Sequence, residues 1–428
     1  MAVSSKACCR HWKDAHRRVR SRLAHGLSLF APLLFGCAAT CTAGLDYFHP
    51  YAELNLRSSF NVSSLNEDAG TPPLSIETKD KHYFRLRAGA EAGWESGVAA
   101  GFALQAVGLW SGANGDDDVD AGVPETWLAL SEIGYLPLSV TVGRQSIQFG
   151  RGLLVSDFEH AWSFDAIRAQ YDAFPVAWEI MAGQPTHLSP DTPLKRVGLA
   201  RMTHEPSASL VRERELCGGV LEARDGAMIF PFGGRLELMP SPELLVWSEF
   251  VYETGETLCK DSLSAWIGDL GCEYSFRKVD FRTVFRTRWT SASGDGANGG
   301  RDFIPMMDRG VGGMILRPRL SNIHILQIGV ELPVTQWARV CLDAYGYRRY
   351  EAENGAVGIA GGIYEGLTIP ANDGSRDLGW ETNIAFDLEY KEGSLFRVAA
   401  GLFRFGDAYG DVPENEVFEV RVEVVWKY

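Results

Sequence analysis

The chain has 428 residues, of which 46% are hydrophobic and 22% charged. Beyond residue 43 no segment approaches the ~18 consecutive apolar residues that a membrane-spanning helix needs, and the composition excludes a coiled coil or a disordered chain. After residue 43, 34 basic side chains stand against 54 acidic ones, a net charge of about −20. This balance argues against nucleic-acid binding, because phosphate contacts require the opposite sign.

The first 43 residues have the three parts of an export signal. Basic side chains occur throughout 6–22, an apolar run occupies 27–39, and small residues follow at 41–43. This order is typical of a secretory signal peptide, so we expect cleavage after residue 43 and export of the mature chain, 44–428. An alternative is a lipoprotein signal in which Cys37 is acylated, and the sequence leaves both open.

Further along, apolar and polar side chains alternate with a period of two in one segment after another. The pattern is clear at 83–91, 281–289, 380–390 and 418–428. Because successive side chains of a strand point to opposite faces, each segment predicts a strand with one apolar and one charged face. In a bilayer the apolar face meets lipid and the charged face lines a lumen, whereas in water it would need a second sheet.

The lengths of the connections separate these two cases. Long connections, such as 291–322 and 352–379, alternate with short ones, such as 333–336 and 391–394, along the chain. Long outer loops and tight periplasmic turns are typical of outer-membrane barrels. We therefore predict an all-β, porin-like fold: a single transmembrane antiparallel β-barrel. The exception is 205–215, eleven residues where a tight turn is expected.

The alternation predicts eighteen strands, enough for a barrel with an aqueous channel. An even number places both ends of the barrel chain on the periplasmic side. The strand 417–428 ends on Tyr428, which resembles the C-terminal signature of bacterial outer-membrane barrels, so we expect the barrel-assembly machinery to recognise it. The predicted strands begin near residues 47, 82, 98, 125, 137, 164, 176, 196, 216, 232, 244, 264, 281, 323, 337, 380, 395 and 417.

The most distinctive stretch is 143–168, which contains Gly143-Arg144-Gln145, Phe149-Gly150, Trp162 and Phe164-Asp165-Ala166-Ile167-Arg168. It resembles the alginate-export porin family, in which a strand ends in Gly-Arg-Gln, a loop passes an aromatic-Gly pair and a Trp, and the next strand opens with Phe-Asp-Ala-x-Arg. Ser163 departs from the basic residue expected two positions before the Asp. The resemblance implies an eighteen-stranded outer-membrane barrel with an arginine-lined pore for an anionic polyuronate.

Eight arginines are the candidate pore-lining and solute-binding residues. A guanidinium fork binds a carboxylate through two parallel hydrogen bonds, which suits a uronate chain. Arg144 shares its phase with Val140 and Val142, so it must lie at a strand end or past a bulge. The competing interpretation is that the arginines pair with wall acids such as Asp343 and Asp387 and brace the barrel. The candidates are Arg85, Arg87, Arg144, Arg168, Arg282, Arg286, Arg288 and Arg339.

Catalytic and metal chemistry find little support in the sequence. The acidic run at 116–120 is interpreted as a solvated loop tip rather than a calcium site, and the four cysteines after residue 43 lack metal-ligand spacing. His160 lies near Asp157 and Glu159, but a solvated loop histidine is the commoner case. We expect no cofactor, no structural metal, no essential disulfide and no enzyme activity.

The predicted function is passive diffusion of small or oligomeric hydrophilic solutes through an outer-membrane channel, with anionic, uronate-type saccharides implied by the resemblance. Polar and charged inward positions favour an open lumen over a plain anchor. The alternatives are a nonselective porin and an adhesin that uses the barrel to display its loops. The expected location is the outer membrane of a diderm bacterium, with membrane lipid and hydrophilic solutes as partners and no nucleic acid.

Overall fold

The computed structural model describes the barrel and parts of its connections. It covers residues 45–66, 75–111, 118–149, 153, 163–186, 194–206, 210–224, 226–256, 262–276, 282–294, 303–304, 311–316, 318, 320–352, 374–390, 393–409 and 416–428, without the side chains of 61–66, 75–79, 109–111 and 118–120. Three features of the sequence fall outside this part. The predicted signal peptide with Cys37, residues 116–117 and His160 are not described, and 118–120 are described without side chains. Within the described part, no helix is long and apolar enough to cross a membrane.

Eighteen strands make up the described fold, together with two short 3-10 helices, η1 (Ile133–Tyr135) and η2 (Asp407–Tyr409). The strands are β1 (Leu45–Asn66), β2 (Ser75–Trp94), β3 (Val98–Ser111), β4 (Asp118–Leu130), β5 (Leu138–Gln145), β6 (Phe164–Ala173), β7 (Val176–Pro185), β8 (Leu194–His204), β9 (Val211–Ala223), β10 (Met228–Ser241), β11 (Leu244–Glu256), β12 (Ser262–Phe276), β13 (Thr283–Ala292), β14 (Ile323–Thr335), β15 (Ala338–Arg349), β16 (Asp377–Tyr390), β17 (Ser394–Phe405) and β18 (Glu416–Lys427).

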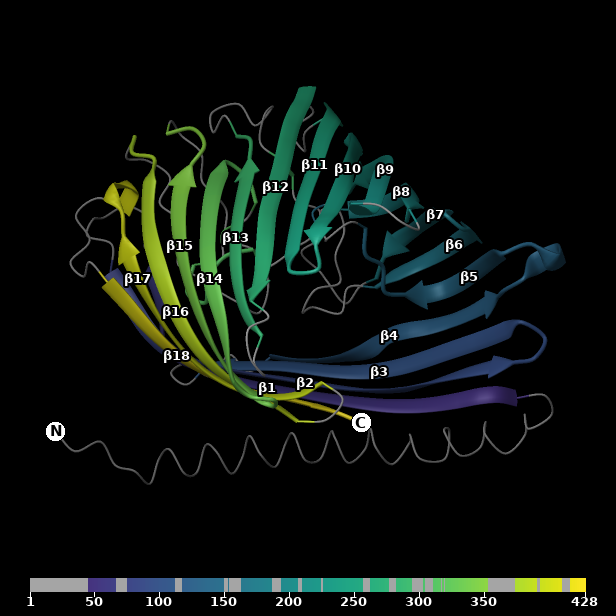
Figure 1. The fold of residues 1–428 in the computed structure, drawn as a ribbon, viewed down its shortest axis with the longest axis horizontal. Helices are drawn as coiled ribbons and strands as arrows, with labels where there is room; N and C mark the ends of the chain where they lie inside the picture. Colours follow the sequence, from purple (N-terminus) through teal and green to yellow (C-terminus); the bar gives the residue numbers. More distant parts are fainter. Residues whose placement is uncertain are drawn as a thin grey trace.

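Every strand pairs antiparallel with its neighbours in sequence, and β18 returns to pair with β1, which closes the barrel. At this seam Glu53 lies opposite Lys427 and Phe60 lies opposite Val420. Figure 1 shows the sheet curling round until β18 lies beside β1 and β2. The predicted fold, a closed antiparallel barrel of eighteen strands, is confirmed.

Several strands begin earlier than the alternation of side chains predicts. β2 begins at Ser75 rather than near 82, β4 at Asp118 rather than near 125, and β9 at Val211 rather than near 216. The backbone ladder continues past the apolar band, where polar side chains no longer alternate with apolar ones. The connection predicted at 205–215, which was too long for a tight turn, is therefore only 205–210.

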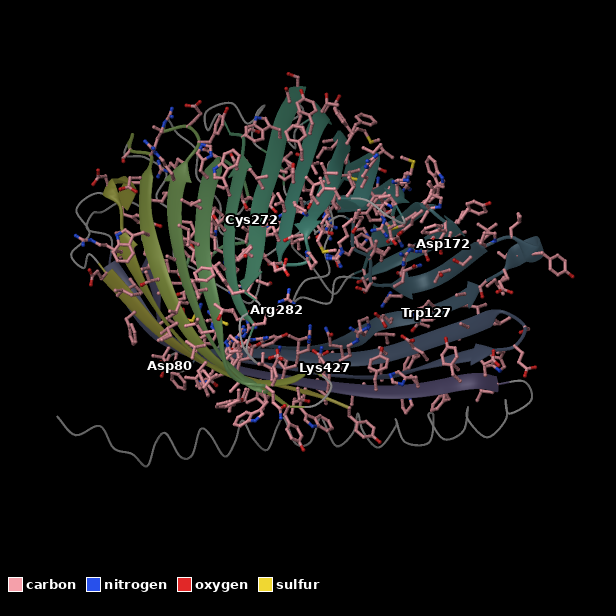
Figure 2. All side chains as sticks on the ribbon, viewed as in Figure 1. Asp80, Trp127, Asp172, Cys272, Arg282 and Lys427 are labelled. Carbon is pink, nitrogen blue, oxygen red and sulfur yellow. The ribbon has the colours of Figure 1, made fainter. Side chains whose placement is uncertain are left out.

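The two faces of the sheet carry different side chains; Figure 2 shows the side chains that project from the wall. On β18, Phe418 and Trp426 are exposed on the outer face, whereas Glu419, Arg421 and Glu423 are buried on the inner one. The predicted alternation therefore places apolar groups outside and charged groups inside, as lipid on one side and a lumen on the other require.

Described parts of two long connections fold into the barrel. Ile147, Phe149 and Leu153 come from the β5–β6 connection, and Phe303, Ile304, Ile315 and Leu316 come from the β13–β14 connection. All of them belong to one buried apolar cluster with inward residues of the wall, such as Leu221 and Ile267. This cluster fills part of the barrel at the end where the long connections lie.

Candidate functional site

Six of the eight predicted arginines lie on the inner face of the wall, and each pairs with a carboxylate there. Most of these pairs join adjacent strands. The pairs are Arg85 with Glu53, Arg87 with Glu125 at 2.5 Å, Arg168 with Glu179 at 2.7 Å, Arg286 with Asp343 at 3.0 Å, Arg288 with Asp269 at 2.7 Å, and Arg339 with Asp387 at 3.2 Å. These arginines therefore form ion pairs across the inner wall, as the competing interpretation expects.

In many of these pairs the carboxylate is buried and the guanidinium is more open to the lumen. The side chain of Asp269 is fully buried, whereas 21% of Arg288 is exposed. Glu179 is 4% exposed against 24% for Arg168. Asp269 also accepts hydrogen bonds from Thr290 and Trp247, at 2.7 and 3.2 Å, which hold it at the wall. The positive member of such a pair is thus the one that faces the interior.

Two carboxylates are each shared by two arginines. Asp387 on β16 accepts hydrogen bonds from Arg339 on β15 and from Arg397 on β17. Glu179 on β7 pairs with Arg168 on β6 and with Arg201 on β8. At both positions one buried carboxylate bridges two guanidinium groups, and one arginine of each pair also reaches a further acid: Glu331 and Glu389 for Arg339, and Glu215 for Arg201.

Arg282 differs from the other candidates. It precedes β13 at the end with short turns, its side chain is exposed, and it forms no ion pair within the described part of the chain. Figure 2 labels it at the end of that strand. Its guanidinium is the candidate whose full charge is available to solvent.

The placement of Arg144 on the pore is wrong. Arg144 lies opposite Thr126, in the same phase as Val142, and its partner Asp165 shares a phase with Ile167. Val142 and Ile167 are about half exposed on the outer face. Arg144 and Asp165 form a forked ion pair with bonds of 2.8 and 3.0 Å, so this pair of motif residues lies on the outside of the wall.

The neighbouring motif residue Gln145 is buried on the inner side. Its side-chain nitrogen donates to the carbonyl oxygen of Ala166 at 3.2 Å. From here the chain leaves β5 and enters the buried cluster through Ile147 and Phe149. The Gly-Arg-Gln motif therefore fixes the point at which this connection turns into the barrel.

Within the described residues, five further inward arginines that sequence analysis did not single out pair with carboxylates. Arg397 and Arg421 could have been found, since each sits between apolar residues in a clear period of two. Arg57, Arg201 and Arg235 lie in strands whose alternation is weaker. Their partners are Asp387 for Arg397, Glu419 for Arg421, Glu423 for Arg57, Glu179 for Arg201, and Glu213 and Glu237 for Arg235.

Metal ligands do not cluster in the residues that the structure describes, where no three His, Cys, Asp or Glu side chains are placed to hold an ion. Cys217, Cys272 and Cys341 are free thiols, and Cys259 lies outside the described residues.

Comparison with known proteins identifies both family and fold. The model of the alginate export family matches residues 111–422. Among solved structures of Pseudomonas aeruginosa proteins, OccK5 (OpdH) is 11% identical with a TM-score of 0.56, covering 88% of this chain and 97% of that one. OccK2 (OpdF) in complex with glucuronate is 11% identical with a TM-score of 0.57, covering 88% and 97%.

OpdK with vanillate is 10% identical with a TM-score of 0.57, covering 89% of this chain and 98% of that one. At these identities the likeness shows the fold. No curated protein matches the sequence. Because the family model spans well over half of the sequence, the chain belongs to the alginate export family.

Proposed function

We propose that this outer-membrane, porin-like channel admits hydrophilic anionic solutes by passive diffusion, and that uronate-type saccharides are the class that fits it best. The observation that carries the proposal is the arrangement of charge on the inner wall. Carboxylates such as Asp269 and Asp387 are fully buried, while Arg288, Arg339 and Arg397 remain between about a fifth and a third exposed.

The net negative charge of the chain does not determine the charge that a solute meets in the lumen. The chain beyond residue 43 carries about 20 more negative than positive charges. A solute in the lumen, however, meets the exposed guanidinium before the carboxylate beneath it. In a confined space these charges are screened less than on an open surface, so they set the local potential.

Guanidinium groups also have hydrogen-bond donors left for a solute. Arg286 bonds Asp343 through Nε and Nη2, and Arg397 bonds Asp387 through the same two atoms. The third nitrogen, Nη1, is left on the side away from the acid in each. A row of such donors suits a carboxylate-bearing chain.

Two comparisons support an anionic solute class. The family to which the chain belongs is described by alginate export, and alginate is a polyuronate. The structural neighbours OccK2 and OpdK were solved with glucuronate and vanillate, which are both carboxylates. In this chain, the partly exposed arginines of the inner wall are the groups that would bind a uronate carboxylate.

The competing function is a nonselective porin. It is favoured by the pairing of six candidate arginines with acids, which cancels much of their charge. An adhesin would use the connections 291–322 and 352–379, most of which lie outside the described residues.

Reversal potentials across planar bilayers in asymmetric salt test the proposal. We expect an anion preference in the wild type, and a weaker one when Arg282, Arg286 and Arg288 are all changed to glutamine. No ion preference in the wild type would favour the nonselective porin, and a cation preference would refute the proposed anion channel. A channel that never conducts would favour the adhesin.

We also propose that residues 1–43 are the export signal and that β18 delivers the chain to the barrel-assembly machinery. Both follow from the sequence alone, since the first segment lies outside the described residues. Sequencing the N-terminus of the membrane-inserted protein tests the first point: residue 44 supports the signal peptide, and a chain beginning at acylated Cys37 supports the lipoprotein alternative.

A further inference from the structure

A buried carboxylate holds part of the β13–β14 connection inside the barrel. Glu381 lies on the inner face of β16 and is completely buried. Its Oε1 accepts the backbone N–H groups of Met314 and Ile315, at 2.5 and 2.8 Å, and its Oε2 accepts that of Leu316 at 3.0 Å. Three consecutive amides thus converge on one side chain.

Two further wall residues hold the same segment, which we call the inner strap (residues 311–316). The hydroxyl of Tyr347 on β15 accepts the N–H of Gly313 at 2.6 Å and lies 3.1 Å from the carbonyl oxygen of Leu316. Arg421 on β18 donates to the carbonyl oxygen of Met314 at 2.8 Å. The inner strap is therefore fixed against the wall from β15 to β18.

The strap lies close to the strand between these anchors. A methyl group added at Gly401 on β17 would lie 2.9 Å from Cε of Met314 and 3.3 Å from Cδ1 of Ile315. At Gly313 an added methyl group would overlap the Glu381 carboxylate itself. Glycine at both positions allows this close approach.

The interaction is strong for a physical reason. A carboxylate removed from water is costly unless hydrogen bonds replace its hydration, and bonds to a charged acceptor are roughly twice as strong as neutral ones. The amides of the strap supply those bonds to Glu381. If they were withdrawn, the wall would contain a buried charge that had lost three donors, so carboxylate and strap stabilise each other.

We propose that Glu381 is a positioning residue for transport: it holds the inner strap against β15–β18 and thereby sets the open cross-section of the channel. This rests on the proposed function, since it assumes that the barrel conducts. A chain segment laid on a sheet occupies up to about 10 Å above it, the spacing of packed sheets, which is a large part of the radius of a porin-sized lumen.

The first measurement is hydrogen exchange of peptides that contain 311–316, and it does not depend on conduction. In Glu381→Gln one oxygen acceptor becomes an amide donor that opposes the N–H groups of the strap. We expect exchange at Met314, Ile315 and Leu316 to become faster by on the order of tenfold or more, because local opening costs less. Unchanged exchange would overturn the proposal.

The matched control is Glu273→Gln. Glu273 lies on the inner face of β12, opposite Arg286, and is not among the anchors of the strap. This variant also replaces one inward carboxylate by an amide, but on a half-buried side chain away from the strap anchors. We expect wild-type exchange at 311–316 in the control, so that a change seen only in Glu381→Gln reports the strap rather than the charge.

The second measurement is single-channel conductance. We expect Glu381→Gln to raise it by roughly half or more, since conductance follows the open cross-section, and Glu273→Gln to leave it near the wild-type value. Faster exchange with a conductance equal to that of the control would show that the strap does not set the opening, and would overturn the proposal.

A second variant covers the case in which Glu381→Gln does not fold. Gly313→Ala keeps the glutamate and its charge but forces the strap away from it, so the same two changes are expected. A wild-type protein that does not conduct would refute the proposed function, and the exchange experiment would still decide whether Glu381 holds the strap.

Discussion

Arg397 forms a forked ion pair with Asp387 on the neighbouring strand: its Nε and Nη2 lie 2.7 Å from Oδ1 and Oδ2 of the carboxylate. The two residues are direct partners in the β16–β17 ladder, and Arg339 lies opposite Asp387 on the other side. One buried acid therefore holds two arginines in register across three strands. Arg339 also pairs with Glu331 at 3.5 Å and with Glu389 at 2.5 Å, so this part of the wall is a network of alternating charges.

Arg397→Gln should weaken both this part of the wall and its charge. We expect a loss of about 1–3 kcal/mol of barrel stability, the cost of removing a charged hydrogen-bond partner, because Asp387 keeps only Arg339. Anion-to-cation permeability should fall as well. Heat-modifiable gel migration measures the first and reversal potential the second. Arg282→Gln is the control, since this exposed arginine should change permeability with little effect on stability.

Arg144→Gln should affect stability only slightly and ion selectivity not at all. The pair of Arg144 with Asp165 lies on the outer face, so its loss should leave ion selectivity at the wild-type value. Stability should fall by about 1 kcal/mol or less, as for partly exposed pairs. A change in selectivity as large as that of Arg397→Gln would contradict the outward placement of Arg144.

Cysteine labelling on β13 tests which face meets water. Phe285 is 44% exposed on the outer face, whereas Arg286 pairs with Asp343 inside. In a background without the native cysteines, Arg286→Cys should react with a small charged thiol reagent and Phe285→Cys should be shielded by lipid. Reversed labelling would mean that the strand is turned by one residue.

Removal of β18 should prevent membrane insertion. This strand pairs with β17 on one side and with β1 on the other, so without it two edges remain open, and unpaired backbone groups are not tolerated in a bilayer. Protease accessibility and heat-modifiable migration of a chain ending at Glu416 check the expectation. Normal insertion of that chain would refute the seam seen here.

The fold could be predicted because its physics is local. Alternation with a period of two, repeated between short and long connections, indicates a barrel without any knowledge of pairing, and β6, β7, β11 and β14 begin at the predicted residues. Strand ends were less accurate where the ladder outlasts the apolar band, as at Ser75 of β2.

The site could be predicted only in part. Alternation assigns Arg286 and Arg288 to the inner face, but it does not reveal that Asp343 and Asp269 lie within reach, because these acids come from other strands, β15 and β12, whose register is unknown from sequence. The motif favours Arg144 as a pore residue, although its phase, shared with Val142, points outward. The role of Glu381 was beyond sequence analysis, since its partners are backbone amides of a distant connection.

The seam between β1 and β18 also bears on how the molecule comes into being. Glu53 and Lys427 are Cα partners there, although almost the whole barrel sequence separates them. Contacts between such distant residues are the slowest to form, because the chain loses conformational entropy before the strand contacts contribute favourable free energy. We therefore expect the final zipping of this seam to limit the rate of refolding from denaturant, while neighbouring hairpins along the chain assemble earlier.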